Sequence, residues 1–313
     1  KEMVDVRVSI VPVNGGENVV LRLLSSKNRQ INLANLGLSS EDLKKINNAI
    51  KEPHGMILIT GPTGSGKTTT VYEMIKTVNS EEVHIATIED PVEYNIEGIS
   101  QIQVNTKANL SFATGLRAIV RQDPDIIMVG EVRDKETAGI AVNSAMTGHL
   151  VLSTLHTNDA ATALPRLLDM EIEPFLIAST VNMIIAQRLL RLICSKCRYS
   201  YSLSPEDLAL IDLVPGMRGR IEKKFNKKIE GLTWYKGSGC KSCSDSGYSG
   251  RIGIYEVLRI DEDIKKLIVN RASSGEINQV AREAGMTTML QDGIQKAANG
   301  LTTINEVIRV IME

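Results

Sequence analysis

The chain has 313 residues, which is enough for a substantial hydrophobic core and for two or three domains. Its 36 basic and 37 acidic residues nearly cancel and only 4% of the residues are aromatic, so a surface built as a whole for nucleic acid is disfavoured. No apolar run approaches the roughly 20 residues of a membrane span, and no secretory leader opens the chain. We therefore expect a cytoplasmic protein.

The first predicted element is a β-hairpin. Apolar residues alternate with polar ones over Val4–Ile10, a turn follows at Asn14–Gly16, and a second apolar run covers Val19–Leu24. The alternation is already under way at the start of the chain, so we expect a natural N-terminal part to precede it. Arg7 and Arg22 fall within the two strands, where periodicity alone predicts exposed side chains.

A helix is predicted to follow the hairpin. Ser39 and Asp42 have the spacing of a capping box, and Leu43, Ile46 and Ile50 supply an apolar stripe. The turn-forming residues 53–55 end the helix before the first core strand. The linker between the domains is expected at about residues 30–38.

The most specific motif is the segment Gly61–Thr68, which matches the pattern of a glycine, four residues and then Gly-Lys-Thr. It lies between an apolar strand, Met56–Thr60, and a predicted helix that runs to Val78, the context that a phosphate-binding loop needs. Backbone N–H groups and the helix N-terminus then surround a phosphate. We expect Lys67 to reach the β- and γ-phosphates of ATP and the Thr68 hydroxyl to complete the shell of Mg²⁺; a glycine-rich turn that binds nothing is the alternative. The predicted nucleotide-binding residues here are Gly61, Pro62, Thr63, Gly64, Ser65, Gly66, Lys67, Thr68 and Thr69.

Three further apolar runs are predicted strands that each end in a functional side chain. Residues 83–88 lead to Glu89 and Glu93, residues 126–129 lead to Glu131, and residues 149–155 lead to His156. Their near-continuous apolar character is typical of a parallel sheet covered by helices on both faces. Because ligands of such sheets bind at the carboxyl ends of the strands, these side chains should meet the phosphate-binding loop.

Four cysteines, the whole complement of the chain, form two Cys-x-x-Cys pairs: Cys194 with Cys197, and Cys240 with Cys243. In a cytoplasmic setting four thiolates in two pairs favour a closed tetrahedral Zn²⁺ site over a redox pair or inert thiols. The 42 residues between the pairs contain a helix capped at Ser204, so a folded subdomain is expected there. The closing segment from residue 261 is predicted to be helical, with stops at Gly285 and Gly300 and a capping box from Thr303 to Glu306.

The segments Thr87–Glu93, Val129–Asp134 and Thr147–Asn158, taken with the phosphate-binding loop, resemble the Asp box, Walker B, His box and Walker A motifs of the secretion ATPases of type II secretion and type IV pilus assembly. The tetracysteine region, followed by Gly247–Glu256, is similar to the assembly branch of that family. The resemblance covers essentially all 313 residues. It implies an α/β fold: a RecA-like P-loop ATPase core with a small N-terminal α+β (PAS-like) domain, a zinc-binding tetracysteine insertion and a helical C-terminal region.

The domain boundaries that follow are 1–34 for the C-terminal part of the small N-terminal domain, 35–46 for the linker and the start of the core, 47–193 for the ATPase core, 194–250 for the tetracysteine subdomain and 251–313 for the helical C-terminal region. The resemblance further implies a homo-hexamer at the cytoplasmic face of the inner membrane. There it would hydrolyse ATP to ADP and phosphate and would drive pilus or pseudopilus assembly through inner-membrane platform proteins.

The resemblance also assigns roles to individual residues. Glu131 would polarise the attacking water, and Glu89 and Glu93 would help to place metal and water; for Glu93 a structural salt bridge is the alternative. His156 and His149 would sense the γ-phosphate; for both, a buried histidine bonded to backbone is the alternative. Lys67, Glu89, Glu131 and His156 are the predicted catalytic residues.

Four arginines, Arg7, Arg22, Arg117 and Arg121, stand at positions that the resemblance places around the γ-phosphate, which reverses the expectation from periodicity for the first two. A guanidinium suits this task because it is permanently charged and can bind two phosphate oxygens. If the N-terminal domain supplies Arg7 and Arg22, its closure would depend on the γ-phosphate.

The segment 218–228 carries six basic residues and one acidic residue. A solvated surface is its ordinary interpretation, and contact with anionic lipid or with a membrane-embedded partner is the sharper one.

Two other functions compete with the secretion motor. A nucleic-acid motor with a zinc module would need a basic channel and stacking aromatics, which the composition disfavours, so we expect no nucleic-acid partner. A P-loop kinase or nucleotide switch would need an acceptor-substrate pocket, of which the sequence shows no trace.

Overall fold

The computed structural model describes residues 5–24 and 32–312, and for residue 5 and residues 22–24 it describes the backbone alone. The strands are β1 (Asp5–Val13), β2 (Gly16–Leu24), β3 (Gly55–Thr60), β4 (Ile85–Glu89), β5 (Ser100–Gln103), β6 (Ile126–Val129), β7 (Leu150–Leu155), β8 (Val181–Ile193), β9 (Arg198–Tyr201), β10 (Trp234–Gly237) and β11 (Tyr248–Arg259). The helices are α1 (Ser40–Ala49), α2 (Lys67–Val78), α3 (Phe112–Val120), α4 (Lys135–Met146), α5 (Ala163–Asp169), α6 (Pro174–Thr180), α7 (Pro205–Asp212), α8 (Met217–Phe225), α9 (Glu262–Val269), α10 (Ser274–Glu283), α11 (Met289–Ala298) and α12 (Ile304–Met312).

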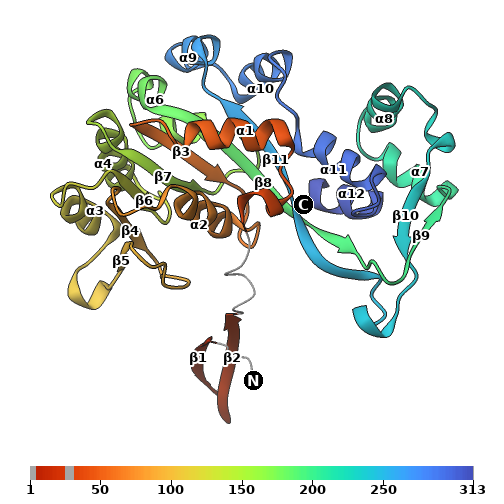
Figure 1. Cartoon of the computed structure of the whole chain (residues 1–313), viewed down its shortest axis with the longest axis horizontal. Coiled ribbons are helices and arrows are strands. Elements are labelled where there is room, and N and C mark those ends of the chain that lie inside the picture. Colours follow the sequence, from red (N-terminus) through yellow and green to blue (C-terminus); the bar gives the residue numbers. More distant parts are fainter. Residues whose placement is uncertain (1–4, 25–31, 313) are drawn as a thin grey trace.

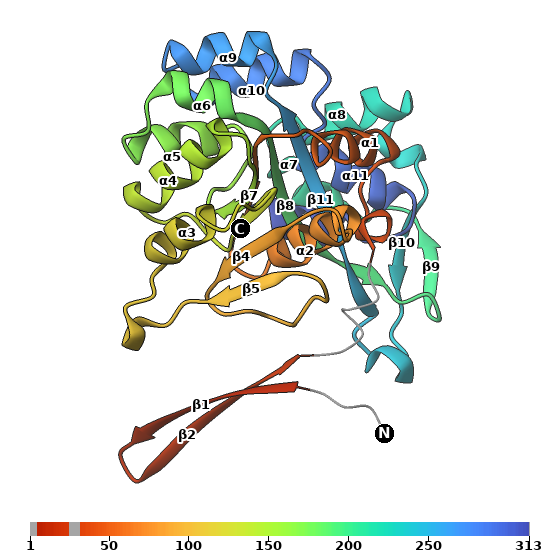
Figure 2. The ribbon, with the colours of Figure 1, turned by 60° about the vertical axis from the view of Figure 1, so that its left-hand side comes forward.

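A seven-stranded sheet in the order β11-β8-β3-β7-β6-β4-β5 forms the centre of the molecule (Figures 1 and 2). Strands β3 to β8 in this sheet run parallel, and β11 pairs with β8 in the antiparallel sense. The register aligns Gly55 with Leu150 and Thr60 with Leu155, so β3 and β7 end together at the carboxyl edge. The predicted parallel strands are therefore confirmed. The sheet also contains three strands that were not predicted: the parallel strands β5 and β8, and the antiparallel edge strand β11.

Helices cover both faces of the sheet, as predicted. Alternate residues of β3 point to opposite faces, as the pleat of a strand requires: Met56 and Leu58 join the core beneath α3 to α6, whereas Ile57 and Ile59 join the core beneath α1 and α2. These side chains are at most 1% exposed, so the strand that leads into the phosphate-binding loop is fixed by packing on both sides.

The prediction of helices from residue 261 is confirmed, because α9 begins at Glu262, whereas the domain boundary drawn at residue 251 falls inside a strand. Residues 248–259 form the long edge strand β11, and helices begin only at Glu262 in α9. Two glycines, Gly250 and Gly253, interrupt the apolar pattern of this strand and conceal it in the sequence. The strand β8, which pairs with it, contains the buried polar side chains of Gln187 and Arg188.

The N-terminal hairpin forms as predicted, from β1 and β2. The predicted linker lies partly in residues 25–31, outside the described residues. Its later part is ordered: residues 33–36 form a 3-10 turn, η2, and Ser39 caps α1 by accepting a hydrogen bond from the N–H of Asp42. Ile46 of α1 is fully buried, so this helix is part of the core and not of a free linker.

The insertion between the cysteine pairs contains α7, α8 and a small two-stranded sheet of β9 and β10, beside the 3-10 turns η4 (Ile229–Gly231) and η5 (Lys241–Cys243). Ser204 caps α7 in a complete capping box, as predicted. Only half of the capping box predicted at α12 forms. Thr303 accepts from the N–H of Glu306, but the Glu306 carboxylate turns to two arginines instead of the N-cap backbone. Within the described ranges, no helix is both long and apolar enough to cross a bilayer.

Candidate functional site

The carboxyl edge of the sheet holds a cavity of about 490 Å³, within the range of small-molecule sites. Residues of the phosphate-binding loop line it together with Glu89, Glu93, Glu131 and His156, which come from the ends of three strands. The structure therefore brings the predicted catalytic residues together. The pocket-lining members of the loop are Thr63, Gly64, Ser65, Gly66, Lys67, Thr68 and Thr69.

The phosphate-binding loop connects β3 to α2, as its motif requires. Gly61, Gly64 and Gly66 have positive φ angles, which only glycine adopts readily. A Cβ atom at Gly61 would lie 2.4 Å from the carbonyl oxygen of Gln187, so the loop also needs this glycine for its close approach to β8. Lys67 Nζ donates hydrogen bonds to the carbonyls of Gly61 and Pro62, at 2.7 and 3.2 Å. Burial lowers the pKa of Lys67, and the nearby Glu131 opposes that shift.

Glu131 lies two residues beyond the end of β6, and its side chain is only 13% exposed. One carboxylate oxygen lies 2.6 Å from Nη2 of Arg133, and the other lies 3.4 Å from Nε2 of His156. The hydrogen bond to Glu131 raises the pKa of Arg133. Thr154 of β7 donates to the Gly130 carbonyl at 2.7 Å, which fixes the backbone beside Glu131. The carboxylate thus faces the cavity from a rigid strand end.

Glu89 is the last residue of β4 and is 2% exposed. Its hydrogen-bond donors within the described ranges are all neutral: the hydroxyls of Tyr72 and Thr87 and the side-chain amide of Gln101. Tyr72 belongs to α2, directly after the phosphate-binding loop, and its hydroxyl also accepts from the N–H of Glu93. Burial and the Glu89 carboxylate raise the pKa of Tyr72, so the phenol remains a donor.

An ion pair links the N-terminal hairpin to Glu93, which lines the pocket. Nη2 of Arg7 lies 3.5 Å from its carboxylate, with both side chains about one-third exposed. The salt bridge that the sequence analysis gave as the alternative for Glu93 is thus present. Arg22 is the register partner of Arg7 in the hairpin, but its side chain lies outside the described part of the chain.

The structure does not bring His149, Arg117 or Arg121 to the pocket of their own chain. His149 precedes β7, at the amino edge of the sheet, and its Nδ1 lies 2.9 Å from the Ser144 carbonyl. His149 is thus bonded to backbone, as in its alternative, although its side chain is half-buried instead of buried. The side chain of His156 is 48% exposed, so the buried alternative does not hold for it. Arg117 pairs with Glu136 at the surface, and Arg121 is the exposed C-cap residue of α3.

Several residues of the site were missed in the sequence. Tyr72 and Gln101 surround Glu89, Arg133 pairs with Glu131, and Leu189 and Arg251 line the cavity from β8 and β11. Arg133 alone carried a signal, because it stands two residues after Glu131 in the quoted motif. Gln101, Leu189 and Arg251 belong to strands β5, β8 and β11, which were not predicted. Tyr72 belongs to the predicted helix α2, but its approach to Glu89 had no signal in the sequence.

The four cysteines converge at the ends of β8 and β11, where their Sγ atoms all lie within 4.8 Å of one another. The Sγ atoms of Cys194 and Cys240 are 3.9 Å apart, and so are those of Cys197 and Cys243. Four thiolates around a tetrahedral Zn²⁺ with bonds of about 2.3 Å would be roughly 3.8 Å apart. The donor set and its spacing therefore fit one structural Zn²⁺.

A Walker-type loop at the carboxyl edge of a mostly parallel sheet, with acidic residues at the neighbouring strand ends, defines the P-loop class of nucleotide-binding proteins. A family model described as type II/IV secretion system protein matches residues 1–309. The chain belongs to this family.

The chain is 47% identical over 310 residues to the type II secretion system protein E of Pseudomonas aeruginosa, which covers 99% of this chain and 59% of that protein. It is 47% identical over 309 residues to the type IV pilus assembly ATPase PilB of Myxococcus xanthus, over 98% of this chain and 52% of the relative. It thus spans little more than half the length of these relatives. Among solved structures, the pilus retraction motor PilT with bound ADP superposes over 97% of this chain and 73% of its own, with a TM-score of 0.69 and 29% identity.

Proposed function

We propose that the chain binds ATP with Mg²⁺ in the pocket and hydrolyses it, as the motor part of a longer protein that drives assembly of a type IV pilus or a type II secretion pseudopilus. The observation that carries this proposal is the cavity of about 490 Å³ that joins the phosphate-binding loop to Glu131 and Glu89. The family relatives named for type II secretion and for pilus assembly support the biological setting.

The residues at the pocket divide the work of phosphoryl transfer, which is mostly positioning and charge stabilisation. Lys67 and the loop N–H groups bind the β- and γ-phosphates. Glu131 orients the attacking water, and Arg133 and His156 hold its carboxylate in place through contacts at 2.6 and 3.4 Å. Arg251 faces the same cavity and can offset phosphate charge.

The side chains around the cavity also fit a magnesium ion. Mg²⁺ prefers oxygen ligands and retains several waters, and the cavity offers the Thr68 hydroxyl with the carboxylates of Glu89 and Glu131. Glu89 receives only neutral donors from the described side chains, so a divalent cation would balance its buried charge. When bound, the ion would screen the phosphate charge; Thr68 would hold it, and Glu89 would act on it directly or through water.

The N-terminal hairpin supplies the proposed coupling to motion. Arg7 now pairs with Glu93 at the rim of the cavity. A γ-phosphate carries more negative charge than one carboxylate and would compete for this guanidinium. We propose that Arg7, with Arg22, then follows the phosphate and closes the hairpin onto the core.

We further propose that the motor is a homo-hexamer, peripheral to the cytoplasmic face of the inner membrane, that contacts membrane-embedded platform proteins. Identical subunits joined head to tail close into rings, which lets each site respond to its neighbour. On the basic segment 218–228, Arg218 is paired with Asp212 and Glu230, whereas Arg220, Lys223 and Lys228 are exposed and available to anionic lipid.

The proposal is tested by ATPase assays on three variants. Lys67→Ala should lose ATP binding, because the loop loses its phosphate cation. Glu131→Gln should still bind ATP but hydrolyse it at least ~10²-fold more slowly, the scale of a lost positioned base. Glu97→Gln, at an exposed glutamate outside the pocket lining, is the matched control and should keep wild-type turnover. Near-normal turnover in Glu131→Gln would contradict its role, and stimulation of the wild type by DNA would favour a nucleic-acid motor.

A further inference from the structure

The strands β8 and β11 leave the central sheet as a two-stranded ribbon. The pairing of β8 with β3 ends where Ala186 meets Thr60, whereas its pairing with β11 continues to Ile193. An isolated two-stranded ribbon is only marginally stable in water. Something other than a third strand must therefore fix the path of residues 187–193.

This ribbon connects the two sites of the molecule. At its inner end, Gln187 Nε2 donates to the Ser65 carbonyl at 2.7 Å, and Leu189 and Arg251 line the nucleotide cavity. At its outer end, Cys194 follows β8 directly and begins the tetracysteine cluster. From residue 187 to residue 194 an extended strand covers roughly 23 Å. Any swing of the ribbon would thus move both sites together.

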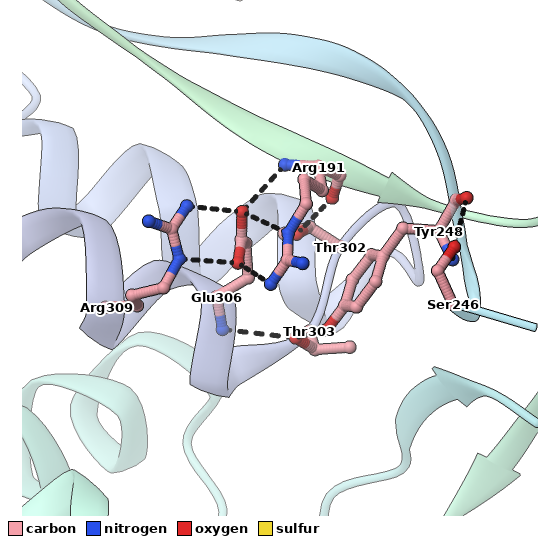
Figure 3. A network of polar contacts seen from close by, with 7 residues as sticks. All are labelled: Arg191, Ser246, Tyr248, Thr302, Thr303, Glu306 and Arg309. Atoms are coloured by element: carbon pink, nitrogen blue, oxygen red, sulfur yellow. Dashed lines mark hydrogen bonds and ion pairs between the residues drawn. The ribbon is translucent and has the colours of Figure 1, made fainter. Parts of the chain in front are cut away.

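Helix α12 and the turn before it hold the ribbon at Arg191, between the two sites (Figure 3). The backbone N–H of Arg191 donates to the Glu306 carboxylate at 3.1 Å, and its backbone carbonyl accepts from the Thr302 hydroxyl at 2.8 Å. A third strand would pair with these same backbone groups. Glu306 and Thr302 therefore take the place of the missing strand at this residue.

The side chains strengthen the same junction. The Arg191 guanidinium donates from Nε and Nη2 to Glu306, at 3.0 and 2.7 Å, and Arg309 donates to both carboxylate oxygens from the other side (Figure 3). The face of the Arg191 guanidinium lies 4.2 Å from the ring centre of Tyr248, the first residue of β11. The Tyr248 hydroxyl in turn lies 2.8 Å from that of Thr303. The buried carboxylate thus binds β8 to α12, and Tyr248 links β11 to the same junction through Arg191 and Thr303.

Strand β11 has an irregular register opposite the junction at Arg191. Its register with β8 shifts between Tyr248 and Arg251, where Gly250 has a φ of +83°. A bulge of this kind turns the side chains that follow it, and Arg251, the register partner of Arg191, is the residue that faces the nucleotide cavity. Glu306 therefore holds β8 at Arg191, directly opposite the residue of β11 that lines the cavity.

We propose that Glu306 is a positioning residue that holds the ribbon of β8 and β11, so that Zn²⁺ binding at the tetracysteine cluster and nucleotide binding in the pocket strengthen each other. This inference rests on the proposed function, since it requires a nucleotide in that pocket. Coupling of two sites is reciprocal: each ligand must change the affinity of the other by the same factor.

The test is a pair of equilibrium titrations on the 313-residue chain. Zn²⁺ affinity is measured against a competing chelator, with and without saturating AMP-PNP and Mg²⁺, and AMP-PNP affinity is measured with and without Zn²⁺. In the wild type we expect AMP-PNP to tighten Zn²⁺ binding at least ~5-fold, the lower end of usual coupling, and Zn²⁺ to tighten AMP-PNP binding by the same factor.

Two variants test the junction itself. Glu306→Gln removes the charge and Thr302→Val removes the bond to the Arg191 carbonyl; both should bind each ligand, with the coupling factor reduced to below about 2. Glu283→Gln, at an exposed glutamate of α10, should keep the wild-type factor. If circular dichroism shows that Glu306→Gln does not fold, the coupling factor of Thr302→Val alone tests the junction.

The inference is overturned if the wild type binds Zn²⁺ equally well with and without AMP-PNP, or if Thr302→Val keeps the full factor. A wild type that binds no AMP-PNP would instead refute the proposed function, and this inference with it. That result is distinct from a protein that binds both ligands independently.

Discussion

Three buried or nearly buried glutamates show how differently this chain compensates a carboxylate. Glu306 has two arginines, Glu131 has an arginine and a histidine, and Glu89 has only neutral donors among the described residues. A buried charge is costly unless it is paired. The fully paired glutamate therefore lies in the scaffold. The two less compensated glutamates face the pocket, where a bound divalent cation would offset their charge.

The pairing of Glu306 predicts a specific pH dependence of stability. Burial alone would raise the pKa of Glu306, but hydrogen bonds from Arg309 and Arg191 outweigh it and lower the pKa from 4.5 to about 2. Because the folded-state pKa is depressed, this stabilisation is present above about pH 4.5 and is lost as the pH falls towards 2. The difference in unfolding free energy between wild type and Glu306→Gln should shrink by about 2 kcal/mol between pH 6 and pH 3.

Urea unfolding of both proteins at several pH values measures this difference. Taking the difference cancels acid effects that the two chains share, such as protonation of the other carboxylates. A gap that stays constant from pH 6 to pH 3 would show that the Glu306 carboxylate is not held as the structure places it.

The two motif histidines show a limit of sequence reasoning at the residue scale. His156 follows β7 and His149 precedes it, so the extended strand between them places them roughly 23 Å apart, at opposite edges of the sheet. A motif read along the chain groups both with the phosphate site. Only the direction of the strand separates them, because it places His149 at the amino end of β7 and His156 at the carboxyl end.

At the scale of elements, the strands next to the phosphate-binding loop were predicted because each is a short apolar run between turn signals. The strands β8 and β11 were not predicted. An apolar run interrupted by Gln187 and Arg188 does not distinguish a strand from a buried helix, and Gly250 and Gly253 weaken the strand pattern of β11. Yet these strands supply Leu189 and Arg251 to the pocket. The sequence did not reveal Leu189 and Arg251 as site residues, because they reach the pocket only when β8 and β11 pair in the folded sheet.

A matched pair of glycines tests the helix packing. A Cβ at Gly293 of α11 would lie 2.8 Å from Cγ1 of Val307 in α12, whereas a Cβ at Gly139 of α4 meets nothing within 4 Å. Gly293→Ala should destabilise the chain by about 1–3 kcal/mol through overpacking. Gly139→Ala should stabilise it by up to about 1 kcal/mol, because alanine favours helix over glycine. Thermal unfolding followed by circular dichroism measures both, and equal shifts of the same sign would contradict the crossing of α11 and α12.

At the scale of the whole molecule, the tetracysteine cluster should hold one Zn²⁺ per chain. Elemental analysis of protein purified without chelator should find about one zinc per subunit, because four thiolates form a closed site. Cys240→Ser should lose the metal and destabilise the insertion more than it slows ATP hydrolysis. Metal-free protein with four freely titratable thiols would rule out the site.

The hairpin predicts a change of overall shape with nucleotide. An ATP analogue should compact the chain in small-angle scattering, and replacing both Arg7 and Arg22 with alanine should abolish the compaction while ADP affinity is largely retained, since the proposed contacts are to the γ-phosphate. Specific ATPase activity should also rise with protein concentration if rings are the active form. If the double variant compacts normally with the ATP analogue, Arg7 and Arg22 do not couple the γ-phosphate to closure of the hairpin.

The cysteine cluster also joins the two ends of the insertion, which makes residues 198–239 a loop closed at its base. The entropic cost of a closed loop grows only with the logarithm of its length. The turn between α7 and α8 lies far along this loop from the cluster, with Leu213 and Gly216 exposed. The insertion can therefore accept extra chain at this turn, even a small reporter domain, while the strands that line the nucleotide pocket keep their register.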